Sequence, residues 1–283
     1  MKLKNRTIVI VGGGRGIGRT IAMACAREGA KTVIAARSMS ELQETATKIR
    51  ETIPQAKILT LHCDVTSDEQ VTELFSKAEN QFGPIDGLVC VAGIYGPISP
   101  LEETSIQQWS ETIQINLIGT VRCIMGVVKG MKQRKSGRII LFAGGGQEAM
   151  PNFSAYVSSK GGILRLTETL GAELAPFNIF VNAISPGAVN TLLLDQLLAA
   201  GPEKAGEKFY QKSLEQKEKG GAPAEKSAGL AIYLLSEESR GLHGKNLSAI
   251  WDKYSEIQDP AELSKSDIYT MKRVTDLKGG TRN

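Results

Sequence analysis

The chain is poor in the residues that build several kinds of functional site. Of its 283 residues only two are histidine and four are cysteine, and aromatic residues make up 5%. His62 and His243 stand in no catalytic or metal-binding context, so we treat both as structural. The cysteines show no paired spacing, which argues against a disulfide framework or a metal site and is typical of a reducing compartment. We therefore expect no metal and a weakly aromatic pocket.

Long apolar runs and a strong charge of one sign are missing as well. The net charge is +4, from 34 Lys and Arg against 30 Asp and Glu, with the signs mixed along the chain. This gives no basis for nucleic-acid binding. No signal peptide is evident, and no apolar run reaches membrane-spanning length. We expect a soluble, cytoplasmic protein with neither nucleic-acid nor membrane partners.

What the chain does have is a regular alternation of strand and helix patterns. Such alternation predicts an α/β fold, with a doubly wound, mostly parallel sheet covered by helices on both faces. The length suits one domain of the larger kind. The predicted strands are residues 7–11, 32–36, 57–63, 85–91, 138–143, 179–184 and 246–250, and the clearest helices are 19–28, 40–52, 106–134 and 224–236.

A glycine-rich run follows the first predicted strand and precedes the first predicted helix. Here the missing side chains let the backbone approach a pyrophosphate, and the helix N-terminus offers free N–H groups and a positive dipole end. The spacing is Gly-x-x-x-Gly-x-Gly, formed by Gly12, Gly16 and Gly18, rather than the strict Gly-x-Gly-x-x-Gly. The alternative is a tight turn that merely needs glycine.

Two arginines are placed to distinguish between nicotinamide cofactors. In a doubly wound sheet the end of the second strand meets the adenosine ribose, and an acidic residue there accepts hydrogen bonds from a free 2′-hydroxyl. Here Arg37 follows the strand, and Arg15 lies inside the glycine loop. A guanidinium suits a 2′-phosphate, so the pair favours NADP(H). The alternative is that both arginines are simply solvated.

Residues after the third and fourth predicted strands extend this candidate site. Asp64 could accept a hydrogen bond from an adenine amino group, or it could cap the helix that starts near Ser67. The small pair Ala92-Gly93 leaves room for a ligand at the carboxyl end of its strand.

Three polar residues are candidates for the chemistry. Asn116 interrupts an apolar pattern, and a structural hydrogen bond alone would explain its amide. Tyr156 and Lys160 are four residues apart, so they share a face if the segment is helical. An ammonium beside a phenol lowers the pKa of that phenol, which would make Tyr156 a general acid or base near neutral pH.

Together these pieces resemble the short-chain dehydrogenase/reductase family over about residues 7–250. The resemblance implies a doubly wound sheet of about seven parallel strands and a homodimer or homotetramer. It also implies hydride transfer between NADP(H) and a small-molecule ketone or secondary alcohol. It rests on these pieces in this order: Gly12, Gly16 and Gly18, Asp64-Val65, Ala92-Gly93, Asn116, Tyr156-x-x-x-Lys160 and Pro186-Gly187.

The resemblance also implies a role for each matching residue. Tyr156 would exchange a proton with the substrate oxygen, and Lys160 would hold the nicotinamide ribose and lower the pKa of Tyr156. Asn116 would position a water that relays protons to Lys160. The cofactor would contact Gly12, Arg15, Gly16, Ile17, Gly18, Arg37, Asp64, Val65, Ala92, Gly93, Tyr156 and Lys160, and its nicotinamide end would meet Pro186, Gly187, Val189 and Thr191.

The sequence departs from the family at Ala143, thirteen residues before Tyr156, where the family's catalytic serine stands. That serine donates a hydrogen bond to the substrate oxygen, and losing such a donor costs about 10²–10³ in rate. The enzyme is then slow, or another donor substitutes, or the protein is an NADP-binding regulatory or inactive subunit without turnover. Candidate donors are the N–H groups of Gly144, Gly145 and Gly146 and the side chain of Gln147.

The remaining segments suggest an accessory role around this domain. We expect residues 1–252 to form a single domain, within which 190–223 could act as a mobile lid over the substrate. Residues 253–283 extend beyond the usual family end. They carry enough apolar side chains to pack on the domain or on a neighbouring subunit, over the pocket or as a plain strap.

Overall fold

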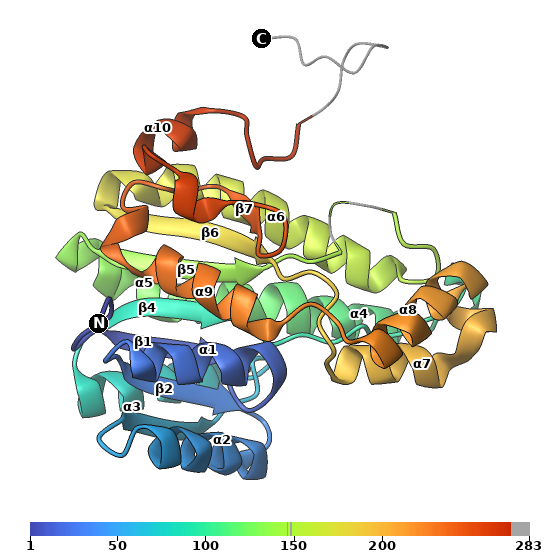
Figure 1. Ribbon diagram of the computed structural model, residues 1–283, viewed down its shortest axis with the longest axis horizontal. Coiled ribbons are helices and arrows are strands. Elements are labelled where there is room, and N and C mark those ends of the chain that lie inside the picture. Colours follow the sequence, from blue (N-terminus) through green and yellow to red (C-terminus); the bar gives the residue numbers. More distant parts are fainter. Residues whose placement is uncertain (146, 148, 273–283) are drawn as a thin grey trace.

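One seven-stranded, all-parallel sheet runs through the computed structural model, which describes residues 1–145, 147 and 149–272 (Figure 1). The strand order is β3-β2-β1-β4-β5-β6-β7. This confirms the predicted α/β, doubly wound fold. The strands are β1 (Thr7–Val11), β2 (Lys31–Ala36), β3 (Lys57–His62), β4 (Ile85–Cys90), β5 (Gly137–Phe142), β6 (Ile179–Ser185) and β7 (Asn246–Ser248).

Helices cover both faces of the sheet because successive strand residues point to opposite sides. Ile8 and Ile10 of β1 pack with helices α1, α2 and α9, whereas Val9 and Val11 pack with α3, α5 and α6. The helices are α1 (Gly16–Arg27), α2 (Met39–Thr52), α3 (Asp68–Phe82), α4 (Ile106–Ile113), α5 (Gly119–Arg134), α6 (Ser154–Leu174), α7 (Leu192–Ala205), α8 (Glu207–Lys219), α9 (Ala224–Leu235) and α10 (Pro260–Lys265).

The predicted helix over residues 106–134 consists of α4 and α5 joined by a π-helical turn, Gln114–Ile118. By length and mean hydropathy it could span a membrane, which corrects the expectation that no such run exists. Its residues Cys123, Ile124 and Val127 are buried against the sheet in one hydrophobic cluster. It is therefore a core helix.

The sheet order reverses between β1 and β4, which directs a ligand to that point. Val11 of β1 pairs with Ala35 of β2 on one side and with Cys90 of β4 on the other. In open α/β sheets, ligands bind in the crevice beyond the carboxyl ends of the strands at such a switch point. The glycine run and Ala92-Gly93 both lie there.

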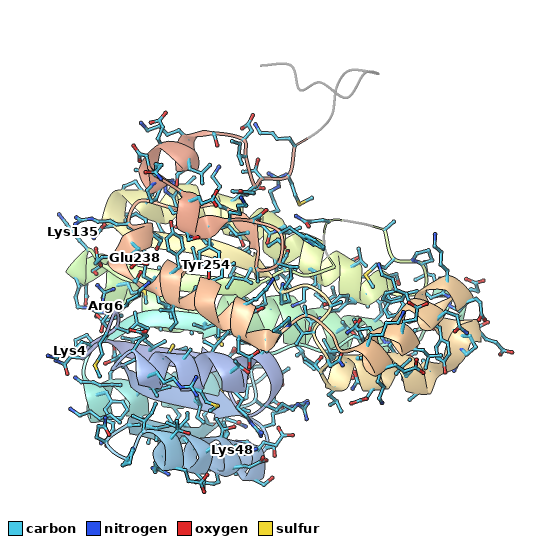
Figure 2. All side chains as sticks on the ribbon, in the orientation of Figure 1. Lys4, Arg6, Lys48, Lys135, Glu238 and Tyr254 are labelled. Atoms are coloured by element: carbon cyan, nitrogen blue, oxygen red, sulfur yellow. The ribbon has the colours of Figure 1, made fainter. Side chains whose placement is uncertain are left out.

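Helices α7 and α8 project at the carboxyl-end side of the sheet, and the N-terminal ion pairs lie at the opposite end (Figure 2). Lys2 pairs with Glu238 at 2.7 Å, and Arg6 pairs with Glu237 at 2.6 Å. Helix α7 is kinked at Gly201, where φ is +81°.

Tyr254 packs against Tyr233 of α9, and the chain from there to residue 272 runs back along β7 and α6, on the side away from α7 and α8 (Figure 1). The Asn246 amide donates to the Tyr269 carbonyl at 2.9 Å, and the Met271 amide donates to the Glu168 carboxylate at 2.6 Å. This part of the tail therefore docks on its own chain and does not cover the switch point. Residues 273–283 of the predicted extension lie outside the described residues.

Candidate active site

The glycine loop between β1 and α1 is too crowded for side chains at two positions. A Cβ on Gly12 would lie 2.6 Å from the Ala92 nitrogen, and one on Gly18 would lie 2.0 Å from the Gly12 carbonyl oxygen. Gly12 also has φ of +92°, a conformation that favours glycine. The loop thus needs its glycines to bring β1, α1 and Ala92 together.

The N-terminus of α1 keeps its backbone donors available. Ser38, Ser67 and Ser105 cap α2, α3 and α4 with their hydroxyl groups, but the capping residue of α1, Arg15, makes no side-chain cap hydrogen bond. The first N–H groups of α1 therefore face the crevice with the positive end of the helix dipole, which fits a phosphate.

A cavity of about 630 Å³ opens in front of this loop. Its volume and its open helix N-terminus fit a dinucleotide. The predicted residues that line it are Gly12, Arg15, Gly16, Ile17, Arg37, Asp64, Val65, Ala92, Gly93 and Thr191. The predicted residues outside its lining are Gly18, Asn116, Tyr156, Lys160, Pro186, Gly187 and Val189.

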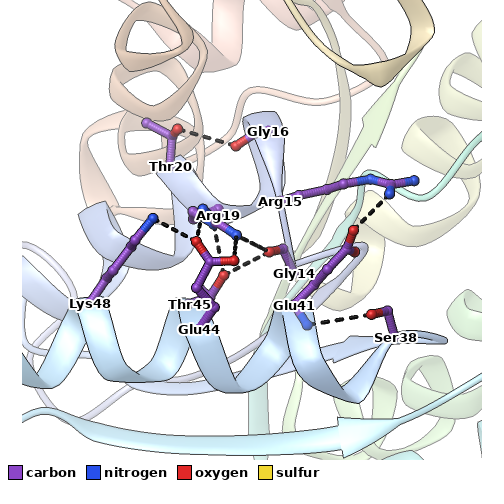
Figure 3. A network of polar contacts seen from close by, with 10 residues as sticks. All are labelled: Gly14, Arg15, Gly16, Arg19, Thr20, Ser38, Glu41, Glu44, Thr45 and Lys48. Atoms are coloured by element: carbon purple, nitrogen blue, oxygen red, sulfur yellow. Dashed lines mark hydrogen bonds and ion pairs between the residues drawn. The ribbon is translucent and has the colours of Figure 1, made fainter. Parts of the chain in front are cut away.

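Charged groups gather at the end of the cavity beyond β2. Arg37 is exposed there, and the Arg15 guanidinium donates to the Glu41 carboxylate at 2.8 Å (Figure 3). Sequence reasoning missed Glu41, although the pattern Ser38-x-x-Glu41 marks it as a residue of the first turn of α2.

Asp64 does not cap α3, because Ser67 does so by accepting from the Gln70 amide. The Asp64 carboxylate instead accepts from the Thr66 amide at 2.9 Å and from the Thr66 hydroxyl at 2.8 Å. Burial acts to raise the pKa of Asp64, but these hydrogen bonds and the Arg37 charge outweigh it, and the pKa is lowered. An ionised acceptor thus stands at the wall of the cavity.

Asn116 and Lys160 meet beside Gly93. A Cβ on Gly93 would lie 3.2 Å from Asn116 Oδ1 and 3.6 Å from Lys160 Nζ. The Asn116 amide is held in the π-helical turn: Oδ1 accepts from the Ile94 amide at 2.9 Å, and Nδ2 donates to the Ile94 carbonyl and to Ser159 Oγ. π-Helical turns inside α-helices occur frequently at functional sites.

Tyr156 lies one turn from Lys160 on α6, and both are buried. The Tyr156 hydroxyl donates to the Gly144 carbonyl at 2.9 Å, and Lys160 Nζ donates to the Phe142 carbonyl at 2.8 Å. Burial lowers the pKa of Lys160 to about 8. The structure thus brings Asn116, Tyr156 and Lys160 together at the carboxyl ends of β4 and β5.

The prediction that Lys160 lowers the pKa of Tyr156 is wrong for this structure. Burial raises the pKa of Tyr156 well above its ordinary value, with a smaller contribution from Tyr95. Lys160 Nζ lies 5.8 Å from the centre of the Tyr156 ring and directs its hydrogen bond to Phe142 instead. Desolvation therefore dominates over the attraction of the ammonium, and Tyr156 stays protonated.

Ala143 is fully buried at the end of β5, and the next residue offers Tyr156 an acceptor rather than a donor, the Gly144 carbonyl. Gly145 packs so closely that a Cβ there would lie 2.7 Å from Tyr156 Cε1. Gln147 is exposed. Gly146, the remaining candidate donor, lies outside the described residues.

The loop after β6 reaches toward the glycine loop. Gly187 has φ of +77°, and the Val189 amide donates to the Gly187 carbonyl at 3.0 Å. This turn brings Thr191, the residue before α7, to 3.4 Å from a Cβ placed on Gly16. The segment that begins with Pro186 therefore leads from β6 to the cavity.

An aromatic cluster surrounds Tyr156 on the side of α7 and α8, whereas the cavity in front of the glycine loop is lined by no aromatic residue among those that the structure describes. The Tyr95 ring meets the Tyr156 ring edge to face at a centroid distance of 4.7 Å, and Phe153 meets Phe209 of α8 at 5.6 Å. Leu197 of α7 is buried in the same cluster. Composition could not predict this cluster, because the chain has few aromatic residues and only the folded structure brings several of them together.

Comparison with known proteins identifies the family to which this site belongs. Residues 6–200 match the sequence model of the short chain dehydrogenase family. Levodione reductase of Leifsonia aquatica is 33% identical over 243 residues, covering 84% of this chain and 90% of its own. The crystal structure of levodione reductase superposes with a TM-score of 0.82 at 28% identity, over 90% of this chain and 99% of that one.

Two further similar structures were solved with a nicotinamide cofactor bound. NAD⁺-bound xylitol dehydrogenase has a TM-score of 0.80 at 28% identity, covering 88% of this chain and 98% of that one. Actinorhodin polyketide ketoreductase with NADPH has a TM-score of 0.78 at 26% identity, over 87% and 97%. The chain belongs to the short-chain dehydrogenase/reductase family, whose members are oxidoreductases that act on alcohol or carbonyl groups with a nicotinamide cofactor, NAD or NADP.

Proposed function

We propose that this chain is an NADP(H)-dependent oxidoreductase that interconverts a small-molecule ketone and a secondary alcohol, with Tyr156 as the general acid and base. The observation that carries the proposal is the placement of Lys160 and Asn116 beside Gly93, which lines a cavity with an open helix N-terminus, with Tyr156 one turn from Lys160 on α6. The cofactor, when bound, supplies or accepts the hydride.

Each residue has a distinct task in this proposal. Tyr156 donates its phenolic proton to the substrate oxygen during reduction and takes a proton back during oxidation. Burial raises the pKa of Tyr156, so its phenol holds the proton that reduction of the ketone requires. Lys160 binds the nicotinamide ribose with its ammonium, and Asn116 positions a water that passes protons to Lys160. The segment formed by Pro186, Gly187, Val189 and Thr191 holds the nicotinamide end.

The preference for NADP(H) rests on the charge beyond β2. Arg37 is exposed at the cavity wall, and Arg15 also lines the cavity. A hydrogen bond to a charged group contributes about 1.5–3 kcal/mol, so one such arginine supports a preference of roughly ten- to a hundredfold. The phosphate loop itself, with Gly12, Gly16 and Gly18, serves NAD and NADP equally.

A second candidate function is NADP binding without turnover, as a regulatory or inactive subunit. Ala143 favours it, because the serine hydroxyl of the family is missing at a buried position next to Tyr156. The retained Asn116, Tyr156 and Lys160 favour the enzyme, since a binding protein needs no general acid.

We also propose how the chain works as a whole. Residues 1–252 form the catalytic domain, 190–223 act as a lid on the substrate, and 253–283 serve as a packing extension. This role for the lid is supported by Leu197 of α7 and Phe209 of α8, which pack in the same hydrophobic cluster as Tyr156. The four cysteines are free and buried, which suits the reducing cytoplasm, where we propose a homodimer or homotetramer.

The test follows NADPH absorbance against a panel of ketones, 3-oxoacyl thioesters and keto-sugars, with NADH as the comparison. Turnover in the wild type that is lost in Tyr156→Phe supports the enzyme. Tight NADPH binding with no turnover across the panel favours the binding protein instead. A clear preference for NADH overturns the role given to Arg37.

A further inference from the structure

Two arginine–glutamate pairs connect the glycine loop and α1 to α2, and only one of them faces the cavity (Figure 3). Arg15 pairs with Glu41 at 2.8 Å, and both residues line the cavity. Arg19 pairs with Glu44 at 3.0 Å and also donates to the Gly14 carbonyl. Neither Arg19 nor Glu44 lines the cavity, so this second pair only braces the loop on α2.

Helix capping does not explain where the Glu41 carboxylate points. In a capping box Ser38-x-x-Glu41, the serine hydroxyl accepts from the glutamate amide and the glutamate carboxylate accepts from the serine amide. The structure forms the first bond, at 3.4 Å. Within the part of the chain that the structure describes, the carboxylate bonds to Arg15 instead, and its side chain keeps 30% of its surface exposed.

We infer that Glu41 limits the preference of this site for a 2′-phosphate over a free 2′-hydroxyl, an inference that rests on the cofactor part of the proposed function. A carboxylate hydrogen-bonded to Arg15 occupies the cation that a 2′-phosphate needs, and it repels the phosphate as a like charge. The same carboxylate can accept a hydrogen bond from a 2′-hydroxyl. Arg15 and Arg37 thus favour the phosphorylated cofactor, and Glu41 opposes them.

The direct test measures binding of the adenosine half alone. Calorimetry gives the Kd of adenosine 2′,5′-bisphosphate and of 5′-AMP for the wild type and for Glu41→Gln, which keeps the size and the hydrogen-bonding shape. We expect the bisphosphate to bind roughly fivefold more tightly to the variant at low salt, from the loss of one like charge at close range. 5′-AMP should bind equally well or more weakly. The gain should shrink as salt is added.

The chain provides a matched control and a coupling test. Glu44→Gln removes the same charge from the same helix but outside the cavity, so the ratio of the two dissociation constants should stay as in the wild type. In an Arg15→Gln background, Glu41→Gln should change the ratio less than it does alone, because part of its effect is the release of Arg15.

Three results would overturn the inference. One is a weaker binding of the bisphosphate by Glu41→Gln, which would mean that Glu41 holds Arg15 in place for the phosphate. Another is an equal shift in Glu44→Gln, and the third is a wild type that binds neither ligand. The binding ratio needs no turnover, so its outcome is separate from that of the NADPH assay on Tyr156→Phe.

Discussion

The two sides of the site are built in different ways. The side that we assign to the cofactor is centred on the glycine loop, whose small residues Gly12, Gly16 and Gly18 are close in the sequence. The side that we assign to the substrate is formed by large rings from separate segments, among them Tyr95 after β4, Tyr156 on α6 and Phe209 on α8. Local sequence therefore determines the first side, whereas only tertiary packing creates the second.

The two sides also differ in how their charged groups meet water, and we expect this to separate cofactor affinity from catalysis. On the cofactor side, charged groups at the cavity wall make ion pairs that remain partly in water, such as Arg15–Glu41 and Lys217–Asp195. Around Tyr156 and Lys160 burial shifts both pKa values toward the neutral forms. We expect substitutions on the cofactor side to change the Kd of the cofactor but hardly the turnover rate. Substitutions around Tyr156 should do the reverse.

The sharpest way to break this separation is Tyr156→Phe. Removing the general acid should lower kcat/KM by about 10²–10⁴, because the substrate oxygen loses its proton donor. The Kd of NADPH, measured by fluorescence, should change less than about twofold. A variant that keeps more than a tenth of the wild-type turnover would contradict the role of Tyr156.

The next largest effect concerns stability, because Lys160 is buried with its charge disfavoured. Its pKa falls from 10.5 to about 8 in the folded protein, so from pH 8 to 10.5 the unfolded chain holds more protons, and stability rises with pH across that window. Below pH 8 the cost of the buried ammonium is complete, about 3 kcal/mol.

The variant Lys160→Met should remove this cost. At pH 7 its cofactor-free form should melt several degrees higher than the wild type, and the rise in melting temperature from pH 8 toward pH 10 should disappear. Thermal unfolding followed by circular dichroism measures both. Equal slopes in the two proteins would show that Lys160 keeps its charge without penalty.

Arg37→Gln tests the cofactor side by itself. We expect the Kd of NADPH to rise roughly ten- to a hundredfold while the Kd of NADH stays unchanged, since only the phosphorylated cofactor loses a charged partner. Arg50→Gln on α2, which lies outside the cavity, is the control. A parallel loss for both cofactors would point to a disturbed loop rather than to phosphate recognition.

The smallest effect is expected from Ala143→Ser, a gain on the substrate side. Restoring the hydroxyl next to Gly144 should raise kcat about tenfold, less than the full value of such a donor, because the surrounding packing has adapted to alanine. Steady-state kinetics with the best substrate of the panel decides this. An unchanged kcat would show that another donor already serves the substrate oxygen.

Much of the fold was predictable because its signals are local. The strands predicted as residues 7–11, 32–36 and 179–184 agree with the observed strands to within one residue at each end, since buried parallel strands are continuous apolar runs. The glycine spacing likewise predicted where the tight loop between β1 and α1 lies. The residues Asn116, Tyr156 and Lys160 were found through their family pattern, and the structure brings them together.

Other features depend on contacts between distant segments and left no local signal. The pKa of Tyr156 is set by burial beneath α7 and α8, which no spacing along α6 reveals. Glu41 matches a helix-capping pattern, and its partner Arg15 is 26 residues away. The Glu41 carboxylate could cap its own helix or pair with Arg15. Which of the two it does is determined only when α2 has packed on the sheet.

The π-helical turn at Gln114–Ile118 requires a definite number of residues between α4 and α5. A wide turn holds one residue more than an α-turn, and one residue rotates a helix by about 100°. Helix α4 faces α6, while α5 faces β4 and β5. The extra residue therefore sets the rotation of α5 about its axis relative to α4, so that both helices make their contacts. Deleting any one residue there would turn either α5 off the sheet or α4 off α6, whichever side chain was removed. In this turn, the packing of α4 and α5 depends more on the number of residues than on which residues they are.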